Sequence, residues 1–414
     1  MPKQWRAGPS AVRRERLTEA LPAEELFARV DKLAPVIAAS ADESERLRRL
    51  APAAVETLSH AGLFRLWVPR SLGGAEVDAA TLVRIVEAIS RIDGAAGWCV
   101  TIASNSSLPA GYLPSAAARH IYGDDPLLVT GGTWPPLGQA VAVNGGYRVT
   151  GRWPFASGCH HTRWLEAGCR IIEDGTPRLE ANGSPVVRIL YLPASSCEIL
   201  DTWDTSGLRG TGSHDFTAQD VFVPTDHTVS FHEPPVEKGP LYAFPIIVLS
   251  WTSIAAVSLG IARHALDILT KVSQSKVAMR SQQALSQGSV VQIDLGRAEG
   301  LLRSGRALLH QTIDEAWQIV TAGKQLAVGD RAMLSLAATH ATSSAIEAVD
   351  LACRAAGSAS LYTNSKLERC QRDVRAAGTH IAVAYPNYEL VGQALLGFNM
   401  RMTTLMRADE RYDY

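Results

Sequence analysis

The sequence predicts a mostly α-helical protein with a central β domain. Apolar residues recur at helical spacing up to about residue 122, short alternating segments separated by turns fill residues 126–224, and long helical periods return from residue 242. We therefore expect a flexible leader (1–22), an N-terminal helical domain (23–125), a middle antiparallel β-barrel or sandwich (126–230) and a C-terminal four-helix bundle (231–414).

The N-terminal region predicts helices over residues 24–38, 41–61, 78–89 and from about 93 onward. Gly62 suits a C-cap of the second helix, and Asp78 can cap the third. Between these two helices, residues 63–75 form an apolar connector closed by Pro and Gly-Gly. The small residues of the fourth helix allow close packing against another helix.

The middle region predicts short strands at 128–130, 139–143, 146–153, 164–167, 188–192 and 215–223. The C-terminal region predicts four long helices over 246–275, 290–322, 330–357 and 374–405. This helical–β–helical order excludes a doubly wound nucleotide-binding fold, and neither GxGxxG nor GxSxG occurs. We expect a pocket where the β unit meets the bundle, because pockets favour domain interfaces.

Composition indicates a globular protein that binds neither nucleic acid nor membrane. The chain is 46% hydrophobic and 20% charged, and its formal net charge of −1 provides no basic footprint. We find no run of about 18 apolar residues that would span a bilayer, and no signal-peptide core. The six cysteines lack CxxC spacing, so we expect reduced thiols in a cytoplasmic protein without a metal site.

Two segments rich in Gly, Ser and Thr stand out in the middle region, at 153–161 and 202–213. Glycine lets backbone approach a flat ring, short hydroxyl side chains bind the polar edge of that ring, and neighbouring aromatics exclude water. Each segment alone is equally compatible with turns in an ordinary β domain whose tryptophans form the core. Together they predict a site for a flat heterocycle with polar edges.

Four stretches carry a resemblance to a known family. They are the connector Leu63-Phe64-Arg65-Leu66-Trp67-Val68-Pro69 with Leu72-Gly73-Gly74, the strand Gly151-Arg152-Trp153-Pro154-Phe155-Ala156-Ser157-Gly158, the segment from Thr202-Trp203-Asp204 to Gly210-Thr211-Gly212-Ser213, and Arg369-Cys370-Gln371-Arg372-Asp373 followed by His380. In these stretches the chain resembles the acyl-CoA dehydrogenase fold. It is similar in particular to the branch of two-component flavin-dependent monooxygenases that hydroxylate phenols and related aromatics.

Two departures separate the chain from true acyl-CoA dehydrogenases. Those enzymes commonly carry a catalytic Glu soon after the Arg-Asp pair, whereas here the ionisable group in that window is His380, and Glu389 fits the motif badly. The usual T-E-P-x-x-G-S-D flavin loop is replaced by residues 131–138. An FAD-dependent acyl-CoA dehydrogenase or oxidase stays open as an alternative, as does a flavin-fold binding protein without catalysis.

The resemblance implies that reduced flavin reacts with O2 to form a C4a-hydroperoxide that hydroxylates an aromatic or polycyclic substrate. It assigns Ser157 to hold the proton on flavin N5. His380 would lie over the flavin, where it hydrogen-bonds the peroxide or deprotonates a phenol. We consider His120 a second polar group at the pocket. For each of the three, a purely structural role is the alternative.

The remaining candidates would bind the cofactor. Aromatic side chains would wall or stack on the flavin, and polar ones would hold its phosphate or ribityl oxygens: Trp134, Trp153, Phe155, Arg209, Thr211, Ser213 and Arg280. The resemblance implies that a neighbouring subunit can supply Arg280. Core packing of the tryptophans and a solvated Arg280 are the alternatives. We expect FMNH2 first and FADH2 second.

The partners follow from the missing nicotinamide fingerprint and from the resemblance. A separate NAD(P)H-flavin reductase would have to supply the reduced flavin. The apolar bundle helices would form both a substrate tunnel and the core of a homotetramer. The residues name neither the substrate nor the reductase.

Overall fold

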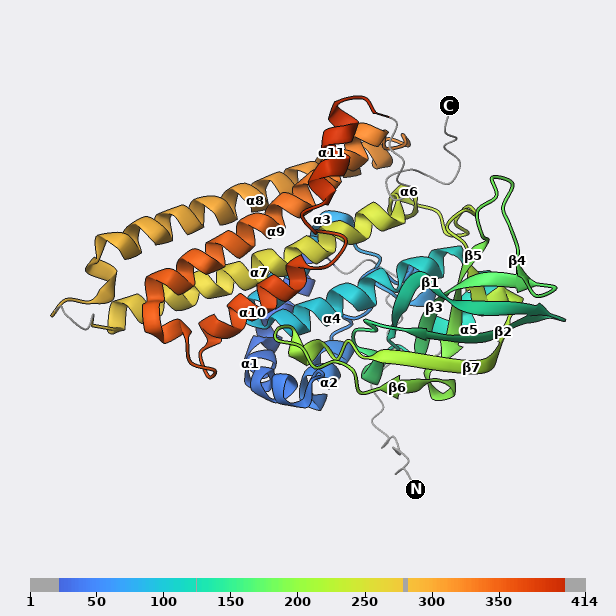
Figure 1. The fold of residues 1–414 in the computed structure, drawn as a ribbon, viewed down its shortest axis with the longest axis horizontal. Helices are drawn as coiled ribbons and strands as arrows, with labels where there is room; N and C mark the ends of the chain where they lie inside the picture. Colours follow the sequence, from blue (N-terminus) through green and yellow to red (C-terminus); the bar gives the residue numbers. More distant parts are fainter. Residues whose placement is uncertain (1–21, 124, 278–281, 399–414) are drawn as a thin grey trace, which may run out of the picture.

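The structure is a computed structural model that describes residues 22–123, 125–277 and 282–398. The predicted leader, apart from residue 22, and Arg280 therefore lie outside the described residues. Figure 1 shows the long helices on one side of the molecule and the sheet on the other, with α4 (Gly94–Asn105) reaching from the first to the second. This confirms a mostly helical protein with a central sheet.

The remaining N-terminal elements are α1 (Ala23–Leu47), α2 (Pro52–His60), η1 (Arg70–Leu72), α3 (Ala79–Ile92), η2 (Leu108–Tyr112) and α5 (Ser115–Tyr122). As predicted, Asp78 caps α3 by accepting a hydrogen bond of 2.8 Å from the Thr81 backbone N–H. Gly62 follows α2 in the left-handed region, with φ of 74°.

The predicted break between the first two helices, at residues 39–40, is wrong. α1 continues to Leu47 and stops where Arg48 adopts the left-handed conformation, with φ of 53°. Pro52 then opens α2, and its ring holds Ala51 in an extended conformation, with ψ of 145°. The decisive signal was therefore Pro52, which lay inside the helix predicted over 41–61.

The sheet contains β1 (Thr130–Val143), β2 (Gly146–Trp153), β3 (Trp164–Glu173), β4 (Thr176–Pro177), β5 (Val187–Pro193), β6 (Glu198–Leu200), β7 (Asp215–Pro224) and β8 (Thr228–Val229). The pairing order is β6-β7-β2-β1-β3-β5-β8, with β4 on β3. The other five predicted strands lie within it, but the strand predicted at 128–130 is wrong, because only Thr130 of that segment belongs to β1.

One strand pair differs from the predicted antiparallel arrangement, because β1 and β3 are parallel and Thr130 pairs with Trp164. After β2 the chain does not turn back on itself but crosses to the far side of β1. The crossing passes through η3 (Cys159–His161), within the first glycine-rich segment. This crossover carries that segment over one end of the sheet.

The C-terminal region forms α6 (Pro240–Ala243), α7 (Ile246–Ser275), η7 (Leu285–Gln287), α8 (Ser289–Thr321), α9 (Val328–Ala356), η8 (Gly357–Ser360), α10 (Lys366–Gly378) and α11 (Asn387–Leu395). A single fourth helix over 374–405 is wrong. α10 starts earlier and ends at Gly378, and α11 begins only after Pro386, while residues 399–405 lie outside the described ones. The break leaves a loop at residues 379–386 that carries His380.

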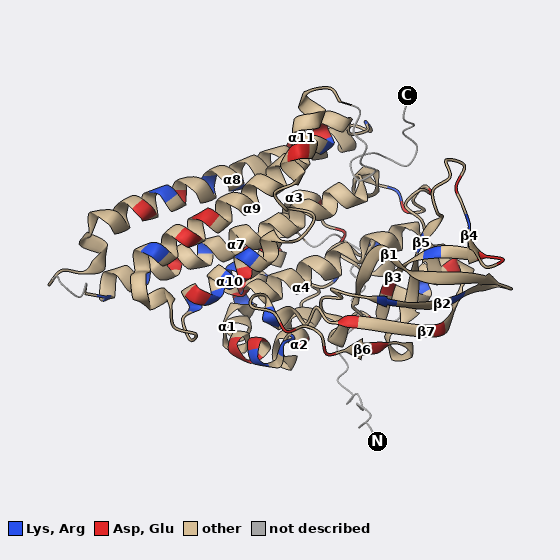
Figure 2. Cartoon of the chain, viewed as in Figure 1, with Lys and Arg blue, Asp and Glu red and all other residues tan. Residues whose placement is uncertain are grey.

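Within the described residues, α7 is the one helix long and apolar enough to cross a membrane. Its most apolar window has a mean hydropathy of 1.7, but 83% of that window is buried inside the fold. Both charge signs are interspersed along the bundle and the sheet (Figure 2), in keeping with the net charge of −1. All six cysteines are free thiols, as predicted.

Candidate active site

The two glycine-rich segments lie side by side at the end of the sheet that faces α4. The Ala156 N–H donates to the His214 carbonyl at 3.0 Å, and the Gly158 N–H donates to the Thr211 carbonyl at 2.9 Å. Gly158 has φ of 75°, a conformation that glycine adopts without strain. The structure therefore brings together the two segments that the sequence analysis singled out.

Three hydroxyl side chains from these segments form a continuous line, which we call the hydroxyl row: Ser157, Ser213 and Thr211. Their oxygens are separated by 2.6 Å between Ser157 and Ser213 and by 2.7 Å between Ser213 and Thr211. All three side chains are buried. In the second segment, η5 (Arg209–Thr211) holds the backbone in the tight turn that places Thr211 against Ser213.

Trp98 joins the hydroxyl row to His380. Its indole Nε1–H donates to Ser157 Oγ at 3.0 Å, and its ring meets the His380 ring edge-on, with centroids 5.6 Å apart. Asp93 starts α4 by accepting from the Ala96 N–H at 2.7 Å, which fixes the first turns of the helix that carries Trp98. The sequence analysis did not assign a role to Trp98. Its available signal was a large aromatic in a run of small residues.

His380 lies half-buried in the loop after α10. Burial lowers the pKa of its imidazole to about 4, so the ring is neutral at pH 7. The backbone N–H of Ala382 donates to His380 Nδ1 at 3.2 Å. Because Nδ1 accepts, the hydrogen of the neutral ring resides on Nε2, which is left as a donor.

A second connection ties α10 to the hydroxyl row. Asp373 Oδ1 accepts a hydrogen bond of 2.6 Å from the Leu208 N–H, and Arg372 donates to the Ser206 carbonyl. Burial raises the pKa of Asp373 to about 7. The predicted Arg-x-x-Arg-Asp signature therefore anchors the second glycine-rich segment to the bundle.

Beside the hydroxyl row, β1 contains the segment that replaces the usual flavin loop. The pairing of β1 with β3 shifts register between Thr133 and Gly138, where two prolines cannot donate to the ladder. Trp134 Nε1 donates to Glu166 Oε2 at 2.6 Å, and its ring packs edge-on against Phe231. Burial raises the pKa of Glu166 well above its ordinary value. The sequence analysis missed Glu166, which looked like one residue of a strand.

Three predicted site residues do not join this group. Trp153 is fully buried in the sheet core, where its Nε1 donates to the Gly168 carbonyl at 2.8 Å and its ring stacks on Phe216, so it does not wall a ligand. His120 is exposed on α5 and packs against Trp164 and His227. Arg209 pairs with Asp204 at 3.2 Å and donates to the Thr205 carbonyl at 2.6 Å.

Phe155 lies next to the hydroxyl row but points outward. It is 66% exposed, has φ of 62°, and meets the Trp203 ring edge-on at 6.2 Å. An exposed aromatic in the strained left-handed region is unusual for a core residue and suits a surface that a ligand or another subunit covers.

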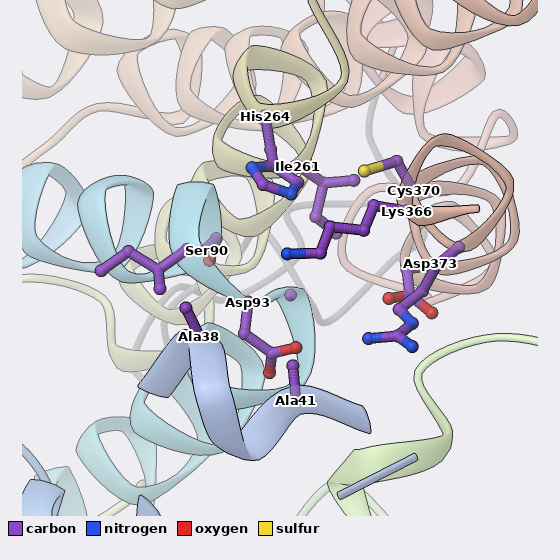
Figure 3. Close-up of a pocket in the computed structure, with 12 residues that line it drawn as sticks. Ala38, Ala41, Ser90, Asp93, Ile261, His264, Lys366, Cys370 and Asp373 are labelled. Carbon is purple, nitrogen blue, oxygen red and sulfur yellow. The ribbon is translucent and has the colours of Figure 1, made fainter. Parts of the chain in front are cut away.

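A cavity of about 30 Å³ with both charged and apolar residues in its lining lies away from the hydroxyl row, between α1, α3, α7 and α10. Figure 3 shows Lys366 from α10 and His264 from α7 pointing into this space, with Asp93 and Asp373 at its rim. A cavity of this size and polarity accommodates about two water molecules. It is therefore not the apolar cleft that the sequence analysis expected for a flavin.

The residues around the hydroxyl row fit a flavin by their spare hydrogen-bonding capacity. Ser157 Oγ has an acceptor lone pair beyond its bonds to Trp98 and Ser213, and Thr133 Oγ1 is buried without a hydrogen-bond partner in the described part of the chain. A side chain at Gly131 would come within 3.5 Å of the Ser157 carbonyl oxygen, so backbone of β1 passes close to the row. Ser157 and Thr133 therefore have hydrogen-bonding capacity left for a ligand at this junction.

Two family models match the helical regions on either side of the sheet. The model of the acyl-CoA dehydrogenase N-terminal domain matches residues 24–114, and that of the C-terminal domain matches residues 252–385. Indole-3-acetate monooxygenase of Pseudomonas putida is 32% identical over 356 residues, covering 86% of this chain and 89% of the relative. The flavin-dependent monooxygenase oxygenase subunit HsaA of Mycobacterium tuberculosis is 28% identical over 372 residues, covering 87% and 92%.

A solved structure is similar over nearly the whole chain. XiaF from a Streptomyces species, in complex with FADH2 and glycerol, superposes with a TM-score of 0.85 at 27% identity, covering 92% of this chain and 97% of XiaF. The chain thus belongs to the acyl-CoA dehydrogenase fold superfamily. Within that superfamily it is a member of the two-component flavin-dependent monooxygenases, the branch that the sequence motifs indicated.

Proposed function

We propose that this chain is an oxygenase component that uses reduced flavin and O2 to hydroxylate a small aromatic or polycyclic substrate. The observation that carries the proposal is that Trp98 contacts both Ser157 and His380. Ser157, assigned to flavin N5, and His380, assigned to the peroxide or the substrate, therefore contact the same side chain. A separate NAD(P)H-flavin reductase would supply the reduced flavin.

The cofactor we propose is FADH2, although the sequence analysis placed FMNH2 first, because the similar structure XiaF is described with FADH2. Bound reduced flavin supplies the electrons that activate O2. Ser157 and Thr133 would hold its polar edge, Ser213 and Thr211 would support Ser157 from behind, and Phe155 would cover it.

His380 contributes as a hydrogen-bond donor in this proposal. Its Nδ1 accepts from Ala382, so only Nε2–H is available to an oxygen atom in the site. Of the two roles that the resemblance implied, the donor role agrees with this geometry, whereas deprotonation of a phenol would require the other tautomer. The low pKa keeps the ring in the neutral state that this role needs.

The position of Glu389 does not support the dehydrogenase alternative, which would need a carboxylate base at the site. Glu389 lies exposed on α11 and accepts from Gln393 at 3.1 Å, one turn along the same helix. No described contact joins it to Trp98 or to the hydroxyl row. The proposal therefore follows the oxygenase branch.

We also propose a homotetramer in the cytoplasm. Large apolar side chains with exposed fractions of 60% or more occur on α8, after η8, on the loop after α10 and at the end of α11, among them Val290, Ile293, Leu361, Tyr385, Leu395 and Leu396. Apolar surface of this kind is usually covered in oligomers. Light scattering of the purified protein would give the mass directly, and a monomer at micromolar concentration would contradict this part of the proposal.

The central test is anaerobic mixing of the protein with FADH2 or FMNH2, followed by ¹⁸O2 and a panel of phenols and indoles. We expect one ¹⁸O atom in the product. Flavin binding without oxygen transfer to any aromatic, combined with bleaching of bound FAD by an acyl-CoA, would establish the dehydrogenase instead. Absence of binding to either flavin would indicate a protein without this catalysis.

A further inference from the structure

The hydroxyl row has a definite hydrogen-bond direction that follows from counting donors. A hydroxyl group has one hydrogen to donate, and a carbonyl oxygen only accepts. Thr211 Oγ1 lies 2.8 Å from the Leu208 carbonyl oxygen, so the Thr211 hydrogen is used there. Ser213 must then donate to Thr211, and Ser157 must donate to Ser213.

The far end of the row is held firmly, so this direction is not easily reversed. The Leu208 carbonyl accepts from the Thr211 hydroxyl, from the Thr211 N–H at 3.1 Å and from Trp203 Nε1 at 3.0 Å. Leu208 itself is left-handed, with φ of 50°, and its N–H is bound by Asp373. Backbone fixed on both sides keeps the carbonyl oxygen pointed at Thr211.

The near end of the row is fixed by Trp98, which can only donate. Ser157 Oγ accepts the Trp98 Nε1–H and gives its own hydrogen to Ser213. One lone pair of Ser157 Oγ remains for a ligand. Ser157 therefore meets a ligand as an acceptor and has no hydrogen left to donate.

This restriction discriminates between the two states of a flavin. Reduced flavin carries a hydrogen on N5 and donates there, whereas oxidised flavin presents a lone pair at the same atom. A lone pair facing the Ser157 lone pair leaves two buried acceptors unpaired, which weakens binding by about tenfold or more.

We propose that Thr211 is a positioning residue that sets the direction of the hydroxyl row, so that the site binds reduced flavin in preference to oxidised flavin. The inference rests on the proposed function, because it presumes that flavin N5 lies at Ser157. Thr211 acts through Ser213 and Ser157. Its role would be to keep Ser157 Oγ as an acceptor toward the ligand. Oxidised flavin released after turnover would then not compete with the incoming reduced flavin.

The test compares the dissociation constants of FADH2 and FAD for the full-length protein, measured anaerobically by fluorescence. In Thr211→Val the acceptor at the end of the row is lost, Ser213 can turn its hydrogen toward Ser157, and Ser157 gains a hydrogen to donate. We expect the ratio of the FAD constant to the FADH2 constant to fall by about tenfold or more, mainly through tighter FAD binding. Thr211→Ser keeps the hydroxyl and should retain the wild-type ratio.

Two further variants make the result decisive. Ser213→Ala interrupts the row one position nearer Ser157 and should shift the ratio in the same direction, which covers the case in which Thr211→Val fails to fold. Thr205→Val is the matched control, because the Thr205 hydroxyl donates to the Gly207 carbonyl at 3.0 Å in the same segment but has no bond to the row.

The outcomes separate the inference from the proposed function. A wild-type preference for FADH2 that persists in both Thr211→Val and Ser213→Ala would overturn the inference and leave the oxygenase proposal standing. Equal binding of both flavins by the wild type would overturn the inference as well. Binding of neither flavin by the wild type would overturn both.

Discussion

Trp98 Nε1 donates a hydrogen bond of 3.0 Å to Ser157 Oγ, and this bond joins the helical part of the molecule to the end of the sheet. Trp98 belongs to α4, which packs on the bundle helix α7, while Ser157 belongs to the crossover between β2 and β3. Because the same indole ring also contacts His380, a shift of α4 would move the hydroxyl row and His380 together.

Two substitutions of Trp98 distinguish the contribution of its Nε1–H donor to stability from that of its ring. Trp98→Phe removes the Nε1–H but keeps an aromatic ring near His380, so we expect a loss of about 1 kcal/mol in the free energy of unfolding. Trp98→Ala removes both and leaves a cavity beside a buried site, so we expect about 3–5 kcal/mol. Urea titrations followed by circular dichroism would measure both values. Equal stability of Trp98→Phe and Trp98→Ala would show that the ring contributes nothing.

Removing the Ser157 hydroxyl should uncouple flavin oxidation from hydroxylation. In Ser157→Ala the site loses its acceptor for an N–H of reduced flavin, so a larger share of the reducing equivalents should leave as hydrogen peroxide. The measurement is peroxide released and product formed per FADH2 oxidised. Ser195→Ala, at an exposed position in η4 (Ala194–Ser196), is the surface control. Unchanged coupling in Ser157→Ala would remove Ser157 from the site.

Local signals in the sequence were sufficient for much of the fold. Asp78 before an apolar period marked the start of α3, and the alternating segments from residue 139 onward lie in strands of the structure. The break between the first two helices was predicted at the wrong place, because the apolar periodicity was given more weight than Pro52. The parallel β1–β3 pair could not be read at all, since a crossover and a hairpin use similar turn residues.

The site was predictable in its segments but not in its individual side chains. Ser157, Thr211 and Ser213 were singled out, and the structure brings them together. Trp153 belongs to the same segment as Ser157, but it is the last residue of β2 and its side chain is buried in the sheet core, whereas Ser157 follows the strand in the crossover. Trp98 is distant in sequence from that segment, and only the packing of α4 on the sheet reveals their contact.

His380 should act in its neutral form between pH 6 and 8. Burial lowers the pKa of its imidazole to about 4, so the fraction of neutral ring stays nearly constant between pH 6 and 8. We expect His380→Ala to lower product formation per FADH2 by about a hundredfold, with no change in this factor over that range. His120→Ala, at an exposed position on α5, is the control and should leave product formation unchanged. A factor that varies tenfold between pH 6 and 8 would contradict a neutral His380.

Asp373 gives a prediction on stability in which the sign of the pH dependence is fixed. Burial raises the pKa of its carboxyl to about 7 in the folded protein, with Asp93 adding to the effect and the Leu208 N–H opposing it. The unfolded chain releases this proton near pH 3.8, so between pH 4 and 7 the folded state binds more protons than the unfolded state. The contribution of Asp373 to stability therefore falls as pH rises through this window and is constant above it.

The variant Asp373→Asn cannot titrate but retains an oxygen that can accept from the Leu208 N–H. Its stability relative to the wild type should therefore rise between pH 4 and 7, by at most about 1.4 kcal/mol per pH unit, and level off above pH 7. Asp373→Ala also loses the titration but leaves the Leu208 N–H without its partner, so it should lie below Asp373→Asn at every pH. Urea unfolding at several pH values measures the two curves. A stability difference between Asp373→Asn and wild type that falls with rising pH would mean that the carboxyl is ionised inside the fold, and that it anchors the glycine-rich segment as a charge.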